Sequence, residues 1–135
     1  MNSNLPSRKK RVASLAALMI CVGGLLWLSL TPSPPRAPSA LLSWDKLHHA
    51  GAYALLTLLA GICIAQWRPQ WSHPWLVAWI ATAAFGGVVE ILQETLTEVR
   101  RAEWGDMLAN TVGGFLVFLA ATVRNRRLRQ STTPQ

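Results

Sequence analysis

Four long apolar runs dominate the chain. They cover residues 12–30, 47–65, 74–92 and 107–123, with 19, 19, 19 and 17 residues. At a rise of about 1.5 Å per residue, helices of this length reach roughly 25–29 Å, close to the hydrocarbon core of about 30 Å. Inside lipid the backbone polar groups of each span must bond within that span, which favours α-helices. The sequence therefore predicts an all-α transmembrane bundle of four helices with short connections.

The charged residues predict the orientation of these spans. Nine of the thirteen Lys and Arg residues lie at one set of span ends, and all six acidic residues lie at or near the other set. Because cytoplasmic loops are enriched in Lys and Arg, we expect both termini in the cytoplasm. The expected organisation is a basic cytoplasmic N-terminus at 1–11, a membrane domain at 12–123 and a basic cytoplasmic tail at 124–135. A bacterial inner or plasma membrane is the expected location.

Composition supports a membrane protein and argues against a nucleic-acid partner. The chain is 51% hydrophobic and 14% charged, against roughly 25% charged in a typical soluble domain. Its net charge of +7 is split between two tails, and no nucleic-acid-binding module is recognisable. We expect the cations to contact anionic membrane lipids. No cofactor is predicted.

The first run resembles a signal peptide in its order of basic, apolar and small residues. Its 19 apolar residues exceed the usual 7 to 15 of a signal peptide's apolar region. We therefore expect an uncleaved first span. Cleavage would leave three spans and a chain that begins outside.

Polar residues enter three of the runs with helical spacing. The stripes comprise Asp45, His49 and Tyr53, with Lys46 beside them; Glu90, Gln93, Glu94 and Thr97; and Asp106, Asn110 and Gly113. Residues three or four apart share one face of a helix, and ionisable groups at this depth face a bundle interior or a water-filled cleft. The stripes predict a pocket in the outer leaflet. Ala83 with Gly87, and Gly113 with Gly114, predict close packing of the helices around it.

Together these residues resemble a known family. The first segment reads D-K-x-x-H-x-x-x-Y from Asp45, Lys46, His49 and Tyr53, where His49 rather than His48 has the matching spacing. The later segment reads E-x-x-Q from Glu90 and Gln93, then R-x5-D-x3-N from Arg100, Asp106 and Asn110. Over about residues 44–114 the chain is similar to the VanZ-like family of small bacterial membrane proteins. The family is named for resistance to teicoplanin, a lipoglycopeptide that acts on cell-wall precursors. The resemblance implies an integral membrane protein and supplies no mechanism.

Three functions fit the predicted pocket. In the first, it binds the polar head of an amphiphile or cell-wall precursor, with Lys46 and Arg100 on phosphate or carboxylate and Trp44 and Trp104 on the apolar part. The candidate binding residues are Asp45, Lys46, His49, Tyr53, Glu90, Gln93, Arg100, Asp106 and Asn110.

The second function is catalysis on a lipid headgroup, with His49 or Glu90 as general base and Asp106 orienting its partner. The sequence identifies no nucleophile, so whether the chain is an enzyme stays open. The third is a proton or ion path through the same three residues. Four spans are few for a transporter, so this path would require a homo-oligomer. His49, Glu90 and Asp106 are also a conceivable set of metal ligands, but no metal site is predicted, because the chain has no tight ligand motif such as HExxH.

A purely structural explanation also accounts for these residues. Asp45 with Arg100, and Lys46 with Asp106, would form ion pairs that fasten the helix ends, while Asn110 and Gln93 bond loop carbonyls. Interhelical hydrogen bonds in membranes contribute only about 0.6–2 kcal/mol each. Nine polar groups are thus a weak source of stability, which tilts the balance slightly towards a functional site.

Overall fold

The computed structural model describes residues 6–31, 45–96 and 103–131, except for the side chains of Asp45 and Arg129. Within these ranges the chain forms four helices and no strand. They are α1 (Arg8–Leu30), α2 (Asp45–Trp67), α3 (Pro74–Leu96) and α4 (Trp104–Ser131). Each helix is long and apolar enough to cross a membrane. This confirms the predicted all-α bundle of four spans and indicates a multi-pass membrane protein.

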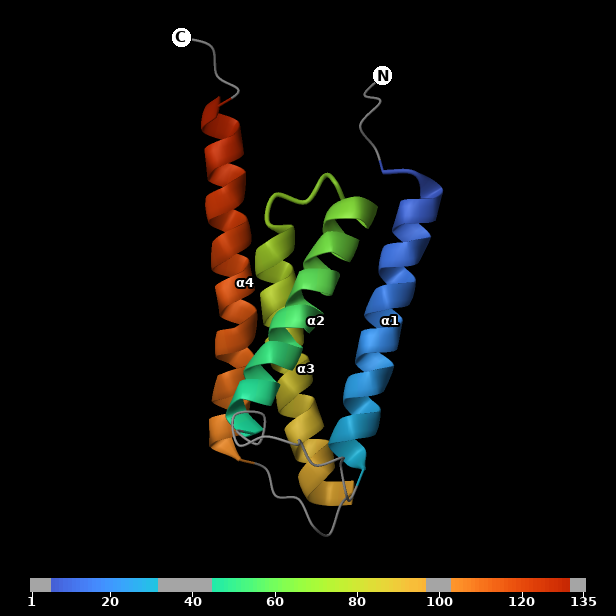
Figure 1. Ribbon diagram of the computed structural model, residues 1–135, viewed down its shortest axis with the longest axis vertical. Coiled ribbons are helices and arrows are strands. Elements are labelled where there is room, and N and C mark those ends of the chain that lie inside the picture. The colour runs from blue at the N-terminus through green and yellow to red at the C-terminus, as the bar shows by residue number, and fades with distance from the viewer. Residues whose placement is uncertain (1–5, 32–44, 97–102, 132–135) are drawn as a thin grey trace.

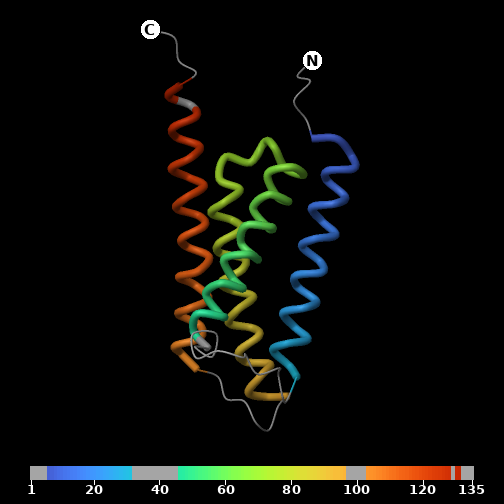
Figure 2. The backbone as a smooth tube through the Cα atoms, viewed as in Figure 1, coloured from blue at the N-terminus to red at the C-terminus, as the bar shows by residue number. Residues whose placement is uncertain are grey.

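The helices alternate in direction along the bundle. In Figure 1, α1 and α3 run one way and α2 and α4 run the other, so both termini lie at one end. The backbone trace in Figure 2 shows the connection between α2 and α3 at this same end. Over their described residues, α2 and α3 each contact all three other helices, whereas α1 and α4 do not meet. The end of the bundle opposite the termini therefore gathers the beginnings of α2 and α4 and the end of α3.

Local chemistry explains where three of the helices begin. The Ser7 side chain accepts a hydrogen bond from the Lys10 backbone N–H at 3.4 Å, which caps α1. Helix α3 begins at Pro74, where the missing N–H costs no helical hydrogen bond and φ is already suited to a helix. The Glu103 carbonyl accepts the Asp106 N–H at 3.0 Å and so starts α4. The helices extend past the apolar runs because backbone hydrogen bonding continues into the interface, beyond the hydrocarbon.

Glycines let α4 approach α2 closely. A Cβ on Gly113 would overlap the backbone carbonyl of Ala50, and a Cβ on Gly114 would lie 2.6 Å from the Thr57 hydroxyl. At Gly113 a larger residue would force the helix backbones apart, and at Gly114 it would displace side chains of α2 and α3. The two backbones therefore pack without intervening side chains, as small residues allow in membranes.

The glycine that brings α3 close is Gly86. A Cβ there would lie 3.0 Å from the Tyr53 ring and 3.3 Å from the Asn110 amide nitrogen, whereas one on Gly87 meets nothing within 4 Å. The expectation that Ala83 and Gly87 form the packing pair is therefore wrong for Gly87. Neighbouring helical residues point about 100° apart, and here Gly87 points away from the interface that Gly86 faces.

The deep tryptophans differ in their roles. Trp79 stacks on Phe118 with ring centroids 5.6 Å apart and donates its indole N–H to the Thr111 carbonyl at 3.1 Å. Trp27, although it lies well inside the first apolar run, is 63% exposed on α1. Trp75, near the start of α3, is buried against Gly61. Position along an apolar run does not determine which side of the helix faces the bundle.

Helix α1 lies at the side of the bundle and has no buried residue. Three side-chain hydrogen bonds join it to its neighbours, and one of them runs from the Trp67 indole N–H of α2 to the Arg11 carbonyl at 3.4 Å. Ser14 donates to the Gln66 side chain of α2 at 3.0 Å, and Gln93 of α3 donates to the Ser29 carbonyl at 3.0 Å. Its exposed apolar side chains, such as Met19 and Ile20, are available to lipid.

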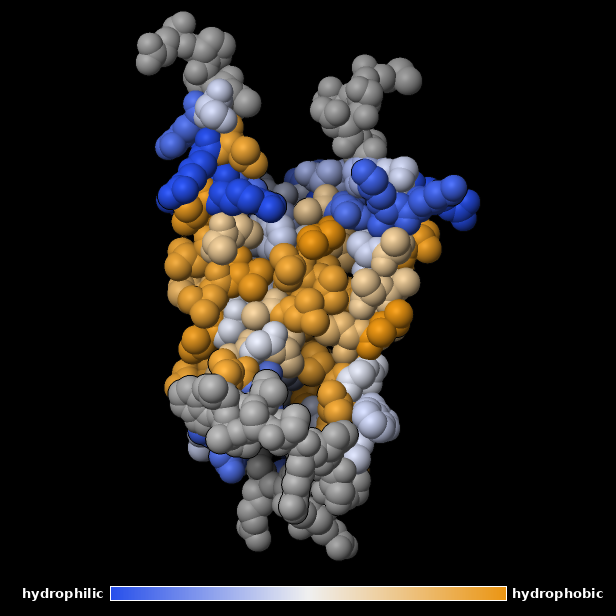
Figure 3. Space-filling model, viewed as in Figure 1, coloured by the Kyte–Doolittle hydropathy of each residue, from blue (hydrophilic) through white to orange (hydrophobic). Residues whose placement is uncertain are grey.

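The surface of the bundle is banded. Figure 3 shows an apolar zone around the middle and hydrophilic residues at the end that carries the termini. Large apolar side chains such as Ile20, Ile80 and Leu116 are 75%, 57% and 58% exposed. Apolar exposure on this scale would be unfavourable in water and is expected where lipid covers the protein.

Candidate functional site

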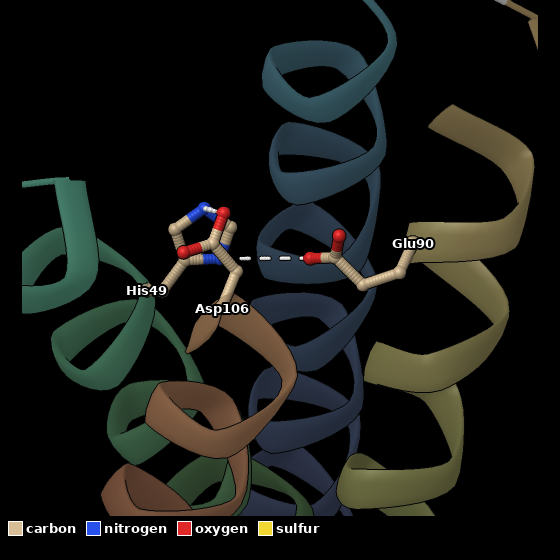
Figure 4. Close-up of side chains that lie close together, drawn as sticks. All are labelled: His49, Glu90 and Asp106. Carbon is tan, nitrogen blue, oxygen red and sulfur yellow. Dashed lines mark ion pairs between the residues drawn. The ribbon is translucent and has the colours of Figure 1, made fainter. Parts of the chain in front are cut away.

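Three helices bring acidic, basic and imidazole side chains together at the end of the bundle opposite the termini. Figure 4 shows His49 from α2, Glu90 from α3 and Asp106 from α4 pointing toward one another. One ligand-type atom from each lies within 4.8 Å of the other two. We call the group that surrounds them the polar cluster. Its members are Lys46, His49, Glu90, Glu103, Asp106 and Asn110.

His49 lies at the centre of the polar cluster. Its Nδ1 is 3.1 Å from Asn110 Oδ1 and 4.0 Å from Glu90 Oε1, and its Nε2 is 3.6 Å from Asp106 Oδ2. The imidazole is therefore held between α3 and α4. A ring nitrogen hydrogen-bonded to an amide oxygen carries a proton, which leaves the lone pair of the neutral ring on the side of Asp106.

Lys46 forms the rim of the polar cluster. Its ammonium contacts Asp106 Oδ1 at 3.1 Å and Glu103 Oε2 at 3.3 Å, and its side chain is 46% exposed while that of Asp106 is 9% exposed. The proposed ion pair between Lys46 and Asp106 is thus present. The buried Asp106 carboxylate is therefore paired with an ammonium that reaches the surface of the protein.

The polar cluster continues inward as layers, each built from one residue of α2, α3 and α4. Below His49, the Tyr53 ring and the Asn110 amide meet across Gly86. One turn deeper, the hydroxyl oxygens of Thr57 and Thr82 are 2.7 Å apart, and both face Gly114. The spacing of four residues along each helix repeats the same face at every turn.

The predicted site residues divide into three groups. The structure brings Lys46, His49, Glu90, Asp106 and Asn110 into contact and places Tyr53 one turn below them.

Gln93 is buried and donates a hydrogen bond to α1 at Ser29. It therefore helps to hold α1 against α3. Arg100 and the side chain of Asp45 lie outside the described residues, as does the proposed ion pair between them.

Sequence reasoning missed three polar residues. Glu103 bonds Lys46, and its position three residues before Asp106 is a signal for the same face of the chain. Thr57 and Thr82 continue the stripes at intervals of four from Tyr53 and from Glu90. That spacing was available in the sequence, but threonine occurs so commonly in membrane helices that the pattern carries little weight without the third helix.

The described charges of the polar cluster favour a cation. Glu90, Glu103 and Asp106 supply three carboxylates, and Lys46 supplies one ammonium. Glu90 and Asp106 are only 3% and 7% exposed. Buried carboxylates in an apolar environment require compensating positive charge or donors. The arrangement can hold a cation directly, and it can position His49 for proton transfer.

A separate groove lies at the opposite end of the bundle. It runs along α4, where apolar side chains including Leu116 and Leu119 adjoin Arg124 and Arg127. None of the residues of the polar cluster lines it. The groove therefore has no part in the chemistry of His49 and its neighbours.

No family model, curated protein or solved structure matches this chain in the comparisons made.

Proposed function

We propose that this chain is a VanZ-like protein of a bacterial inner or plasma membrane that binds the anionic headgroup of an envelope amphiphile in its outer leaflet. The motif resemblance supports the family, and the banded charge supports the orientation. The cationic ends of the helices lie with the termini, and the polar cluster lies at the other end. Under the positive-inside tendency the polar cluster then faces away from the cytoplasm.

The observation that carries the proposal is the position of Lys46. A lysine ammonium has three donors, and Lys46 directs two of them at Asp106 and Glu103. The third is available to a phosphate oxygen, and the side chain is half-exposed. Because the two carboxylates fix the ammonium in place, a headgroup would meet a preorganised hydrogen-bond donor rather than a freely moving chain.

The apolar part of such a ligand also has a surface to contact. Leu47, next to Lys46, is 50% exposed, and Trp104, next to Glu103, is 85% exposed. Indoles favour the boundary between headgroups and acyl chains. A polar head on Lys46 would therefore leave its hydrocarbon chain beside apolar residues of α2 and α4.

The experiment is native mass spectrometry of the full chain in detergent with added phosphatidic acid. We expect one tightly retained lipid in the wild type and about a tenfold loss of retention in Lys46→Gln. That loss corresponds to roughly 1.4 kcal/mol, which is near the strength of a hydrogen bond to a charged group. The matched control is Lys10→Gln, an exposed lysine at the basic end, which should keep the tight lipid. Equal retention in both variants would contradict the proposal.

A second candidate function is acid–base catalysis on the same headgroup. It is favoured by the position of His49, which Asn110 and Asp106 hold from two sides, as an imidazole that moves protons requires. The test is release of a headgroup product from phosphatidic acid by wild type and by His49→Gln. Turnover that disappears in this variant while the lipid is still retained would support catalysis.

The rival account is that the polar cluster only fastens the helices. It predicts that Lys46→Ala, Glu90→Gln and Asp106→Asn all lower the yield of folded protein. Headgroup binding predicts instead that Lys46→Ala, at the rim, folds normally and loses the lipid. Size-exclusion profiles in detergent separate the two accounts.

A further inference from the structure

We propose that His49, Glu90 and Asp106 bind a divalent transition ion of the Zn²⁺ class. Each residue comes from a different helix, and one ligand-type atom from each lies within 4.8 Å of the other two. Imidazole nitrogen with carboxylate oxygen is a ligand set that suits Zn²⁺ and its first-row neighbours. The set has no sequence motif because its members are separated by 41 and 16 residues along the chain.

The separations between His49 and the two carboxylates are longer than direct hydrogen bonds, and each carboxylate lies beside a different ring nitrogen. Nε2 of His49 is 3.6 Å from Asp106 Oδ2 and Nδ1 is 4.0 Å from Glu90 Oε1, whereas charge-assisted N–H···O bonds are about 2.7–2.9 Å long. Metal–ligand bonds of about 2.1 Å place adjacent ligand atoms roughly 3.4 Å apart in a tetrahedral site. An ion bound at Nε2 would lie beside Asp106, and Glu90, now nearer Nδ1, would have to move toward it from within the 4.8 Å that separates the three ligand-type atoms.

The surrounding contacts orient the proposed ligands. Lys46 bonds Oδ1 of Asp106, so that Oδ2 faces His49. The Asn110 amide oxygen bonds Nδ1 of the imidazole, which fixes the tautomer and directs a lone pair toward Asp106. Metal-binding histidines are commonly held in this way by a hydrogen bond to the other ring nitrogen.

Charge and burial point in the same direction. Glu90 and Asp106 are almost fully buried between the helices. In such an apolar interior two neighbouring carboxylates repel each other strongly. A dication would neutralise both carboxylates, while Lys46 balances Glu103 at the rim. The excess of two negative charges in the described cluster, three carboxylates against one ammonium, is then cancelled.

Tyr53 provides an independent observation. Its side chain is 4% exposed, and its hydroxyl has no hydrogen-bond partner among the described residues. Its ring lies against Gly86, one helical turn from Glu90 on α3, and beside Asn110. A buried hydroxyl normally has a partner, and a water bound to an ion above it would supply one.

The alternative is that a protonated His49 is itself the cation between the two carboxylates. This alternative needs no metal and predicts that the purified protein binds none. The two accounts are separated by titrating the full chain, purified in detergent through a tag without histidine and stripped with EDTA, with Co²⁺ alone. Visible absorption reports ligand-bound Co²⁺, and competition with Zn²⁺ reports relative affinity.

We expect one Co²⁺ per chain, displaced by Zn²⁺. His49→Gln should weaken binding by more than the roughly 10–100-fold that changes outside the ligand set produce. The matched control is His48→Gln, an exposed neighbour on the same helix, which should bind as the wild type does. Wild-type protein that binds no ion, or a folded His49→Gln that binds equally well, would overturn the proposal.

A second variant keeps the test decisive if His49→Gln does not fold. The chain has three histidines, and His48 and His73 are both exposed. The double variant His48→Gln with His73→Gln therefore leaves His49 as the only imidazole. Cu²⁺ bound to this protein should show the nitrogen coupling of one imidazole by electron paramagnetic resonance. An absence of that coupling would contradict coordination by His49.

A bound ion would also act on the headgroup site, and this point alone rests on the proposed function. The polar cluster with a bound dication beside Lys46 would attract a phosphate more strongly than the same cluster without the ion. Retention of phosphatidic acid should then fall when EDTA is added. If the protein binds Co²⁺ but EDTA does not change the retention of phosphatidic acid, the metal site is supported. Only the proposed effect of the ion on headgroup binding is then contradicted.

Discussion

The backbone of Gly113 in α4 lies directly against the carbonyl of Ala50 in α2, with no room for a side chain between them. Ala50 follows His49 in the sequence, and Gly113 is less than one turn from Asn110. The close approach of the two backbones therefore sets the distance across which His49 reaches Asn110 and Asp106. The packing of the helices and the geometry of the polar cluster depend on the same contact.

Gly113→Ala should destabilise the bundle. The added Cβ would overlap backbone atoms, which cannot move without displacing α4, and overpacking of this kind costs about 1–3 kcal/mol. The measurement is thermal unfolding in detergent. Gly87→Ala is the matched control because its Cβ meets nothing within 4 Å, and alanine favours a helix over glycine by about 1 kcal/mol. If both variants unfold at the same temperature, the contact does not limit the packing.

The Thr57–Thr82 pair should show an asymmetric response to substitution by valine. Thr82 also donates to the Ala78 carbonyl at 2.9 Å, so in Thr57→Val its hydroxyl keeps a partner. In Thr82→Val the buried Thr57 hydroxyl loses the acceptor it has in the described structure. We therefore expect Thr82→Val to be the more destabilising, by up to about 1–3 kcal/mol.

Denaturant titration in mixed micelles measures both single variants and the double variant. Thr95→Val, on an exposed position of α3, is the control for the change of residue type. Coupling between the two sites should be about 0.6 kcal/mol, as is typical within membranes. Equal losses in the two single variants would show that Thr57 bonds elsewhere.

Gly105→Ala should disturb the rim without disturbing the fold. A Cβ there would lie 2.7 Å from the Lys46 ammonium, which is the end of a flexible side chain and can move aside. We expect little change in unfolding temperature and a several-fold weaker retention of phosphatidic acid, smaller than the effect of Lys46→Gln. Native mass spectrometry checks this. Unchanged lipid retention would argue that the position of the ammonium is unimportant.

Spacing within the sequence was sufficient to predict much of the arrangement. The interval of three from Lys46 selects His49 over His48, and the structure places His49 in the polar cluster and His48 at the surface. The stripes predict that α2, α3 and α4 share one polar face because positions four apart are nearly superposed on a helix. Apolar length predicts the four helices.

The rotation of each helix about its axis could not be predicted from the sequence. Both Gly86 and Gly87 suit close packing, and only the neighbouring helices decide that Gly86 faces Tyr53. Trp27 lies in an apolar run, but hydropathy is the same for a side chain that faces lipid and one that faces protein. The three potential metal ligands come from separate helices, so their proximity depends on helix rotation and depth. These depend in turn on contacts such as that of Gly113 with Ala50.

The side of the membrane on which the polar cluster lies is the most direct test of the whole account. The measurement uses a cysteine-free background, with Cys21→Ala and Cys63→Ala, and an impermeant maleimide applied to intact bacterial cells. A cysteine at exposed Glu94, near the polar cluster end of α3, should be labelled in intact cells. A cysteine at exposed Arg126, at the basic end of α4, should be labelled only after permeabilisation. The reverse pattern would place the polar cluster in the cytoplasm and contradict the proposed binding of an outer-leaflet amphiphile.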